Sequence, residues 1–554
     1  MLAALATALG GGLLAYVLSR KAPTISQLLS FLGSLFVAVF VARVWSRGSD
    51  AASWSPFTNA PSWIAPYLAL DLKVGVLEVV LRATRLGNLA AVGTAFFGVI
   101  ISLYGMTALR EHPERGRFAA FLLWTLCGAL VAVWADNLLF MLVGWETVTL
   151  MLYLMVNANP SGARPAEKAY GILGFTDVGL LMAIAFLMAV GKTRGLSLSD
   201  STIHVGSTGT AMAYLLFLAA ALAKAGAWPL HTWLPPVAKG TPAIVSALLP
   251  ASLDKLLGIY LLARVSLDLF VLAPWVNTLL MVIGAVTILS AVLMAMVQHD
   301  LKRLLGFHAV SQVGYMVLGI GTGIPLGVAG GLFHMVNHAL YKSGLFLVAG
   351  TVERYAKTVE LDDLGGLRRA LPWTLGVAIT TAMAISGVPP TNGFASKWLV
   401  YQGTLAVGGT LGMLVFAVAV FGSALTLASF VKVLHSVFWG PETERSAPAG
   451  RPEPLGMILP MLLIATLCVV LGIWAGPSLG VWIAPALDEL GFSLPPDQLQ
   501  GLSFGNGAWN PLLATILLAC GGALGLLIYA VGGVRRARVA DAFVAGERFG
   551  DRPP

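Results

Sequence analysis

The chain has 554 residues, of which 57% are hydrophobic and 11% are charged, and its mean hydropathy is +0.83. A soluble domain is about 25% charged, so this composition excludes an ordinary soluble protein. The net charge is +8, but the basic residues lie in short loops between apolar runs rather than on one stripe, which excludes a nucleic-acid-binding face. The composition instead indicates a polytopic membrane protein.

Apolar stretches near the ~20 residues that a membrane-crossing helix needs recur along the whole chain. They do not alternate in polarity as the strands of a membrane barrel would. We therefore expect an all-α polytopic membrane protein with about 14–15 transmembrane helices. The expected helices cover residues 2–18, 26–46, 81–104, 117–136, 138–157, 167–190, 211–230, 242–265, 274–297, 304–322, 326–350, 373–395, 400–438, 455–475 and 511–533.

The loops between these helices differ in charge. When the helices are counted in order, most basic loops fall on one side, together with Arg445, Arg451 and the tail that holds Arg535, Arg536 and Arg538. The loop 486–510, on the other side, has acidic residues and no Lys or Arg. This asymmetry predicts a protein of the cell (plasma or inner) membrane with its N-terminus outside and its C-terminus in the cytoplasm.

Two regions need a separate interpretation within this topology. The segment between Arg43 and Arg85 has basic residues that fall on the outer side, and we expect a surface helix within residues 47–80. Asp300, Lys302 and Arg303 follow one another at a cytoplasmic loop. We interpret them as a helix cap with positively charged anchors at that face.

The chain contains a weak internal symmetry. Residues 117–265 and 274–438 each hold five expected spans, and in each block the fourth is interrupted by Pro and carries a Lys. Paired broken segments in corresponding positions are typical of inverted-repeat transporters, and an odd number of spans inverts the second block. We therefore divide the chain into N-terminal helices (1–116), a first half-channel (117–265), a second half-channel (266–440), and C-terminal helices with a basic tail (441–554).

Lys224 lies deep in the apolar run that precedes the first break. A lysine at the bilayer centre costs at least ~2.5 kcal/mol and usually marks an ion or proton pathway. Glu146, a lone carboxylate in another apolar run, is its expected partner, because an unpaired buried charge is far more costly than a paired one. A carboxylate that moved away would release the proton of the ammonium. The alternative is a static ion pair that only fixes helix packing.

Lys255 and Asp254 are adjacent in a span that Pro250 interrupts. Neighbours on a helix point about 100° apart, so we expect Lys255 in the pathway and Asp254 as a modulator or packing group. The alternative is that both side chains reach the membrane surface. Lys397 follows the second broken segment, where unwound backbone is tolerated only if it lines a cavity or is buried in protein.

His334, His338 and Lys342 are spaced four residues apart and line one helix face. Imidazole titrates near neutrality, so this pattern predicts a proton relay. Two His at this spacing also suit zinc, but no HExxH motif and no nearby carboxylate or thiolate completes a metal site. The remaining alternative is that the histidines are buried and bonded to neighbouring hydroxyl or carbonyl groups.

The sequence shows no site for a cofactor. It has no Gly-rich nucleotide loop, and Cys127, Cys468 and Cys520 are isolated within apolar segments. No set of Cys or His suits an iron–sulfur cluster or haem. We therefore expect no redox chemistry in this chain, and its energy must come from an ion gradient or from partner subunits.

Four segments, KAGAWPLHTWLPPVAKGTPAIVSALL, QHDLKRLLGFHAVSQVGYMVLGIG, HMVNHALYKSGLFLVAGTV and SGVPPTNGFASKWLVY, make the chain similar to a known family. In this order they resemble the antiporter-like proton-translocating subunits of respiratory complex I, Mrp cation/proton antiporters and membrane-bound hydrogenase and formate hydrogenlyase complexes. The resemblance covers roughly residues 80–440 and implies two inverted five-helix repeats, each with a broken helix, joined by charged residues at mid-membrane.

The resemblance also implies a role for each matching residue in that proton-conducting line. The matching residues are Glu146 in the family's fifth helix, Lys224 in the broken seventh, Lys255 in the eighth, His334, His338 and Lys342 in the eleventh, and Lys397 in the twelfth. Pro250 and Asp254 depart from the pattern, in a segment where many relatives have His. The short C-terminus leaves no room for the long lateral helix of the largest complex I subunit, which favours the hydrogenase and Mrp-like branches.

We thus expect a proton-translocating subunit of a redox-driven complex, either NADH/quinone oxidoreductase-like or membrane-bound hydrogenase-like. Its expected partners are other membrane subunits and a peripheral redox module, which would hold any iron–sulfur clusters, nickel–iron site or flavin. The transported ion is the proton, with Na⁺ as the alternative. The alternative functions are a subunit of a Mrp-type Na⁺/H⁺ antiporter, a membrane partner in inorganic-carbon uptake, and a scaffold with an inactive channel.

Overall fold

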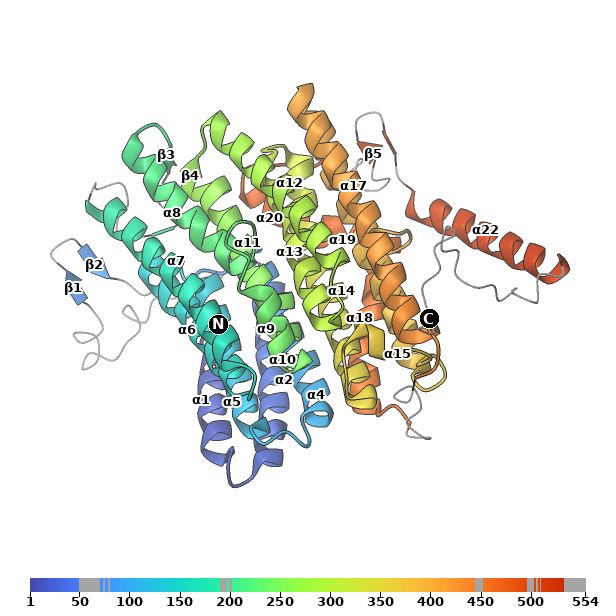
Figure 1. Cartoon of the computed structure of the whole chain (residues 1–554). Helices are drawn as coiled ribbons and strands as arrows, with labels where there is room; N and C mark the ends of the chain where they lie inside the picture. Colours follow the sequence, from blue (N-terminus) through green and yellow to red (C-terminus); the bar gives the residue numbers. More distant parts are fainter. Residues whose placement is uncertain are drawn as a thin grey trace, which may run out of the picture.

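The structure, a computed structural model, describes residues 1–48, 70–72, 75–77, 80–189, 197–198, 202–443, 452–495, 503–504, 507–508 and 510–532. These residues form a nearly all-helical protein in which the helices run side by side (Figure 1). Within the described part, 12 helices are long and apolar enough to cross a membrane, and Leu2–Leu18 and Pro372–Ser386 are shorter apolar helices. The expected all-α polytopic membrane class is therefore confirmed.

The N-terminal half of the chain supplies the helices that surround the first break. They are α1 (Leu2–Leu18), α2 (Pro23–Arg47), α4 (Arg85–Ala108), α5 (Arg115–Trp134), α6 (Leu138–Asn157), α7 (Ala163–Ala189), α8 (Thr208–Ala225), α9 (Leu234–Gly240), α10 (Ala243–Leu248), the π-helix η2 (Leu249–Leu253), α11 (Asp254–Arg264) and η3 (Val265–Leu269). From α10 to η3 the chain is one continuous apolar span.

The C-terminal half supplies the helices around the second break. They are α12 (Pro274–Met296), α13 (Leu301–Gly321), α14 (Pro325–Ala356), η4 (Leu361–Asp363), α15 (Pro372–Ser386), α16 (Asn392–Val407), α17 (Gly409–Leu434), η5 (His435–Trp439), α18 (Leu455–Ile473), α19 (Ala475–Ser478), η6 (Leu479–Ile483), α20 (Ala484–Glu489) and α22 (Pro511–Val531). The apolar helix α22 extends to the side of the other helices (Figure 1).

The described strands are very short and form three separate pairs. Strands β1 (Leu70–Leu72) and β2 (Gly75–Leu77) are antiparallel, as are β5 (Ser503–Phe504) and β6 (Gly507–Ala508). Strands β3 (Ile203–His204) and β4 (Phe270–Val271) pair in parallel. The surface helix expected within 47–80 falls mainly outside the described residues, and so do Arg445, Arg451 and the basic tail with Arg535, Arg536 and Arg538.

Both expected helix breaks are present. Helix α8 ends at Gly226 (φ 76°) and α15 ends at Gly387 (φ 77°), so each half-helix stops at a left-handed glycine. Glycine adopts this conformation without the steric cost that a Cβ brings, which is why it commonly ends helices. The inverted relationship between the two blocks, and the domain boundaries drawn from it, remain predictions.

One expected span is wrong. Residues 400–438 were expected as a single helix, but they belong to the end of α16 and to α17 with η5. Gly408 (φ 72°) and Gly409 (φ 61°) separate α16 from α17, because two successive residues with positive φ cannot continue a right-handed helix. Lys397 consequently lies inside α16, the half-helix that follows the second break.

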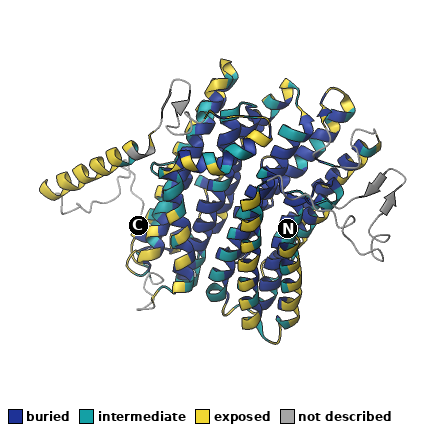
Figure 2. Cartoon of the chain, turned by 180° about the vertical axis from the view of Figure 1, so that it is seen from behind, coloured by how far each residue is buried: buried dark blue, intermediate teal, exposed yellow. Residues whose placement is uncertain are grey.

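Burial divides the molecule into a centre and a periphery (Figure 2). The most apolar stretch of each of the spans Ala243–Leu269 and Leu301–Gly321 is completely buried, whereas 33% of that of Gly409–Trp439 and none of that of Leu513–Val531 is buried. The exposed side chains of the outer helices are largely apolar, which suits contact with lipid rather than water. The centre, made by η2, α11, α13 and α14, holds the polar residues described next.

Candidate functional site

Four lysines lie in the buried centre, each on a different helix. Lys224 on α8, Lys255 on α11 and Lys342 on α14 are fully buried, and Lys397 on α16 is 1% exposed. Among the described residues, none of the four forms an ion pair within 4.0 Å. An ammonium inside the membrane is costly, so these four lysines are candidates for a functional role.

Lys224 is held by the neighbouring helix α6. Its Nζ donates to the Trp145 carbonyl (3.1 Å) and to Thr149 Oγ1 (2.5 Å), and it lies 4.7 Å from the centroid of the Trp145 ring. These two α6 residues in turn bind a carboxylate on α7, since Trp145 Nε1 donates to Asp177 Oδ1 (2.7 Å) and Thr149 Oγ1 to Asp177 Oδ2 (3.1 Å). Lys224 and Asp177 are thus linked through Trp145 and Thr149.

The expected direct ion pair between Glu146 and Lys224 is not formed among the described residues. Glu146 is only half-buried, and it follows Trp145 on α6, so its side chain leaves the helix in a different direction. Asp177 exerts the strongest electrostatic attraction on Lys224, ahead of Asp254 and Glu146. Sequence reasoning missed Asp177, although its position as a lone carboxylate in an apolar run is the same signal that identified Glu146.

Asp254 and Lys255 are both fully buried, which excludes the alternative that they reach the membrane surface. They follow η2, the π-helical turn that contains Pro250. Neither carboxylate oxygen of Asp254 has a hydrogen-bond partner, nor has Lys255 Nζ, which lies 5.7 Å from the centroid of the Trp233 ring. Such π-turns often occur at functional sites, and this one leaves two opposite charges unbonded in the interior.

The α14 residues divide into a bonded and an unbonded group. His334 is fully bonded, through Nδ1 to Ser396 Oγ (2.8 Å) and through Nε2 to Tyr341 OH (3.1 Å). In contrast, no side chain bonds either ring nitrogen of His338, which has only the Ala251 carbonyl beside it, and Lys342 Nζ has no hydrogen-bond partner. Helix α14 packs against η2 and α11, and Lys255 acts electrostatically on both His338 and Lys342. The structure therefore brings Lys255, His338 and Lys342 into one neighbourhood.

Lys397 is bonded to the end of the preceding half-helix. Its Nζ donates to the Ile385 carbonyl in the last turn of α15 (2.8 Å) and lies 4.6 Å from the centroid of the Tyr315 ring. A Cβ on Gly387, which caps α15, would lie 3.0 Å from Lys397 Cδ, and a Cβ on Gly226, which caps α8, would lie 3.1 Å from Lys255 Nζ. Each broken helix thus ends at a glycine with a buried lysine of a later helix beside it.

The structure shows no grouping of three or more His, Cys, Asp or Glu able to hold a metal ion within the residues that it describes. His334 is bonded to two hydroxyl groups rather than aimed at a shared centre with His338. The three cysteines, Cys127, Cys468 and Cys520, are free thiols.

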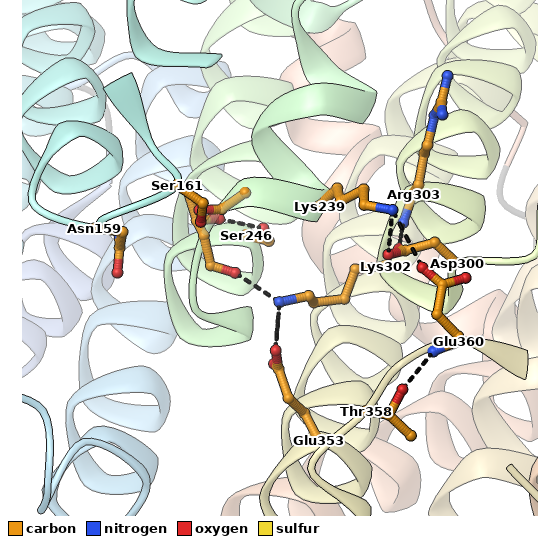
Figure 3. A network of polar contacts seen from close by, with 12 residues as sticks. Asn159, Ser161, Lys239, Ser246, Asp300, Lys302, Arg303, Glu353, Thr358 and Glu360 are labelled. Carbon is orange, nitrogen blue, oxygen red and sulfur yellow. Dashed lines mark hydrogen bonds and ion pairs between the residues drawn. The ribbon is translucent and has the colours of Figure 1, made fainter. Parts of the chain in front are cut away.

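A polar network lies at one end of the helices (Figure 3). Asp300 Oδ1 caps α13 by accepting from the Arg303 amide (2.7 Å), and Lys239 bridges Asp300 and Glu360 at 3.2 Å each. The expectation that Lys302 is a surface anchor is wrong. Its side chain is 5% exposed, because it turns inward from the start of α13 to Glu353 on α14.

Comparison with known proteins decides the family. Residues 135–426 match the family described as NADH:quinone oxidoreductase/Mrp antiporter, TM. The chain belongs to this family. Subunit L of NADH-quinone oxidoreductase from Mycobacterium tuberculosis is 34% identical over 424 residues, which are 74% of this chain and 66% of that subunit. Hydrogenase-4 component B from Escherichia coli is 31% identical over 475 residues, 80% of this chain and 69% of that component.

Solved structures give the same family fold. A chain of the membrane-bound sulfane sulfur reductase, an archaeal respiratory membrane complex, matches with a TM-score of 0.81 and 25% identity over 98% of this chain and 87% of that chain. The resemblance to antiporter-like subunits is therefore confirmed. The aligned part spans just under two thirds of the curated subunit L, and the relatives belong to both the complex I and the hydrogenase branches, so the branch remains a prediction.

Proposed function

We propose that this chain translocates protons as the antiporter-like subunit of a multisubunit, redox-driven membrane complex. The observation that carries the proposal is the set of four buried lysines on α8, α11, α14 and α16, in a membrane protein whose relatives are named as subunits of an oxidoreductase and a hydrogenase. Partner membrane subunits and a peripheral redox module would supply the energy. Any iron–sulfur cluster, nickel–iron site or flavin would lie in those partners.

The switch in this mechanism is the link between Lys224 and Asp177. Thr149 connects the ammonium to the carboxylate, so a small rotation of α6 or α7 separates the two charges. An ammonium that loses its carboxylate in a low-dielectric interior releases its proton. Moving one proton against 100 mV requires ~2.3 kcal/mol, which is comparable to the interaction that the rotation removes.

The next proton transfer in the proposed mechanism runs from Lys224 toward α14. Asp254 lies within electrostatic range of both Lys224 and Lys255, and its unbonded carboxylate can take up a proton from one and pass it to the other. Buried polar groups nearly always have a hydrogen-bond partner, and ordered water is the expected partner of His338 and Lys342. Water between these groups would join Lys255 to Lys342, and Lys397 would complete the line.

The proposal includes an orientation. The basic residues labelled in Figure 3 lie at the ends of α9 and α13, and the positive-inside rule assigns this end to the cytoplasm. We place the N-terminus outside and the C-terminus inside. Labelling single cysteines introduced at Lys239 and at Asn277 with a membrane-impermeant maleimide in intact cells tests this: only the second is expected to react.

The function is tested with the complex in the form in which it copurifies with this chain, reconstituted into vesicles. Lys224→Ala is expected to abolish proton movement coupled to redox turnover, whereas Lys168→Ala, the same change at an exposed position of α7, is expected to keep it. Proton movement that persists at the normal rate in Lys224→Ala, while the redox reaction continues, refutes the proposed role of the lysine line.

The alternative function is a subunit of a Mrp-type Na⁺/H⁺ antiporter, which is supported by the Mrp antiporters in the description of the matching family. It requires no redox partner and predicts proton efflux that depends on Na⁺ in vesicles without an electron donor. Proton movement that requires the electron donor and is indifferent to Na⁺ favours the first proposal. A membrane subunit for inorganic-carbon uptake would instead make bicarbonate accumulation depend on Lys224.

A further inference from the structure

A cavity of about 260 Å³ lies at the basic end of the helix bundle. The ends of α4, α10 and α14 form its walls, and it is lined by Tyr104, Glu111, Pro242, Ile244, Glu353 and Arg354, among others. Glu111 is exposed, so the cavity is continuous with the surface. Charged and hydroxyl groups on its walls suit water rather than lipid.

Behind one wall of the cavity lies a buried ammonium. Lys302 Nζ donates to both carboxylate oxygens of Glu353 (2.8 and 3.0 Å) and to the Thr241 carbonyl (3.0 Å) (Figure 3). The Glu353 side chain is 38% exposed, whereas that of Lys302 is 5% exposed. Glu353 therefore faces the water, and Lys302 lies on the inner side of the pair.

Hydroxyl groups continue inward from Lys302 toward the buried lysines. Thr241 Oγ1 lies 3.1 Å from Ser246 Oγ, and both residues are buried. Ser343 and Ser252 then donate to the Ala247 carbonyl, each at 2.9 Å. Ser343 follows Lys342 in α14, and Ser252 precedes Asp254 by two residues. The ion pair thus stands between the surface cavity and the polar residues that lead to the lysine line.

We propose that Lys302 is an electrostatic plug that closes this cytoplasmic path to passive protons, and that Glu353 is the residue that holds the ammonium in place. The inference rests on the proposed proton translocation and adds the control of its entrance. A fixed positive charge in a narrow polar passage repels protons and other cations. Glu353 makes the buried ammonium tolerable and draws cations into the cavity, because an unpaired buried charge is strongly destabilising.

The competing explanation is that Lys302 is only a structural tie, which joins Glu353 in its own half of the chain to Thr241 in the other half. Thr241 belongs to the segment before α10, whereas Lys302 and Glu353 belong to α13 and α14. A tie and a plug predict different results when the charges are changed one at a time. If Lys302 is only a tie, removing the charge of Lys302 or that of Glu353 weakens the structure in the same way. Loss of a plug opens the path only when the lysine is removed.

The test measures passive proton flux into vesicles that contain the copurified complex, with a trapped pH-sensitive dye, an imposed potassium diffusion potential and no electron donor. Lys302→Met is expected to raise this flux roughly tenfold or more, whereas Lys302→Arg and Glu353→Gln are not. Lys239→Met is the matched control, because it removes an exposed lysine from the same network. Equal flux in Lys302→Met and Lys239→Met overturns the plug.

A charge swap covers the case in which Lys302→Met fails to assemble. The double variant Lys302→Glu with Glu353→Lys keeps an ion pair but places the carboxylate on the inner side, so the plug predicts high flux and a tie predicts normal flux. Normal flux in the swap therefore overturns the plug as well. If the wild type moves protons during redox turnover while these variants do not leak, only the plug fails. If Lys224→Ala also leaves coupled transport unchanged, the proposed function itself fails.

Discussion

Replacing Asp177 by Asn tests which carboxylate stabilises Lys224. The substitution keeps the size and shape of the side chain and removes its charge. Two hydrogen bonds, of 2.5 and 3.1 Å through Thr149, separate the ammonium from the carboxylate, which places the two charges roughly 5 Å apart. At an effective dielectric constant of about 20, their attraction is about 3 kcal/mol, or two orders of magnitude in the protonation equilibrium of the lysine.

We therefore expect Asp177→Asn to lower the rate of redox-coupled proton transport at least about tenfold, measured with a pH-sensitive dye in reconstituted vesicles. Glu146→Gln is the comparison, because Glu146 is half-buried and makes no ion pair with Lys224. Its effect is expected to be smaller. Full coupling in Asp177→Asn together with loss of coupling in Glu146→Gln would refute the reasoning, because Glu146 would then be the counter-ion.

Three further predictions concern stability and the roles of single residues. In a thermal unfolding assay, Gly226→Ala is expected to destabilise the protein by about 1 kcal/mol or more, because Gly226 has a positive φ and an added Cβ would press on Lys255. The control in the same assay is Gly376→Ala, at a helical position where an added Cβ meets no other atom. His334→Ala is expected to lower the melting temperature, because it removes two buried hydrogen bonds. His338→Ala is expected to reduce coupled transport with little change in melting temperature. Burial raises the pKa of Glu489, which lies outside the spanning helices. The wild type is therefore expected to lose stability relative to Glu489→Gln as the pH rises through that pKa. A difference in melting temperature that does not depend on pH would contradict this prediction.

The positions of the helices could be predicted from sequence because a single physical quantity, apolar length, determines them. The expected span 138–157 has the same bounds as α6, and 2–18 has those of α1. The breaks after α8 and α15 were equally visible, because Gly and Pro disfavour a continuous helix for local steric reasons. A break formed by glycine alone is harder to predict, because glycines are common within membrane helices. The break at Gly408 and Gly409 was missed for this reason.

The partners of the buried charges could not be predicted in the same way. Sequence identifies a lone carboxylate, but which of two carboxylates faces Lys224 depends on how α6 and α7 are rotated about their axes. Packing of small and large side chains between helices determines that rotation, and no local pattern encodes it. The same limit explains Lys302. A basic residue near a helix end usually reaches the surface, and only the fold shows that Glu353 and Thr241 hold this one inside.

The two broken helices contact their neighbouring lysines differently. A half-helix ends with free carbonyl groups and a partial negative charge, which stabilises a cation. Lys397 donates a hydrogen bond to the Ile385 carbonyl at the end of α15, whereas Lys255 lies beside the end of α8 without a hydrogen bond. The carbonyl bond therefore fixes the position of Lys397, whereas Lys255 is positioned by packing beside Gly226 and the Trp233 ring.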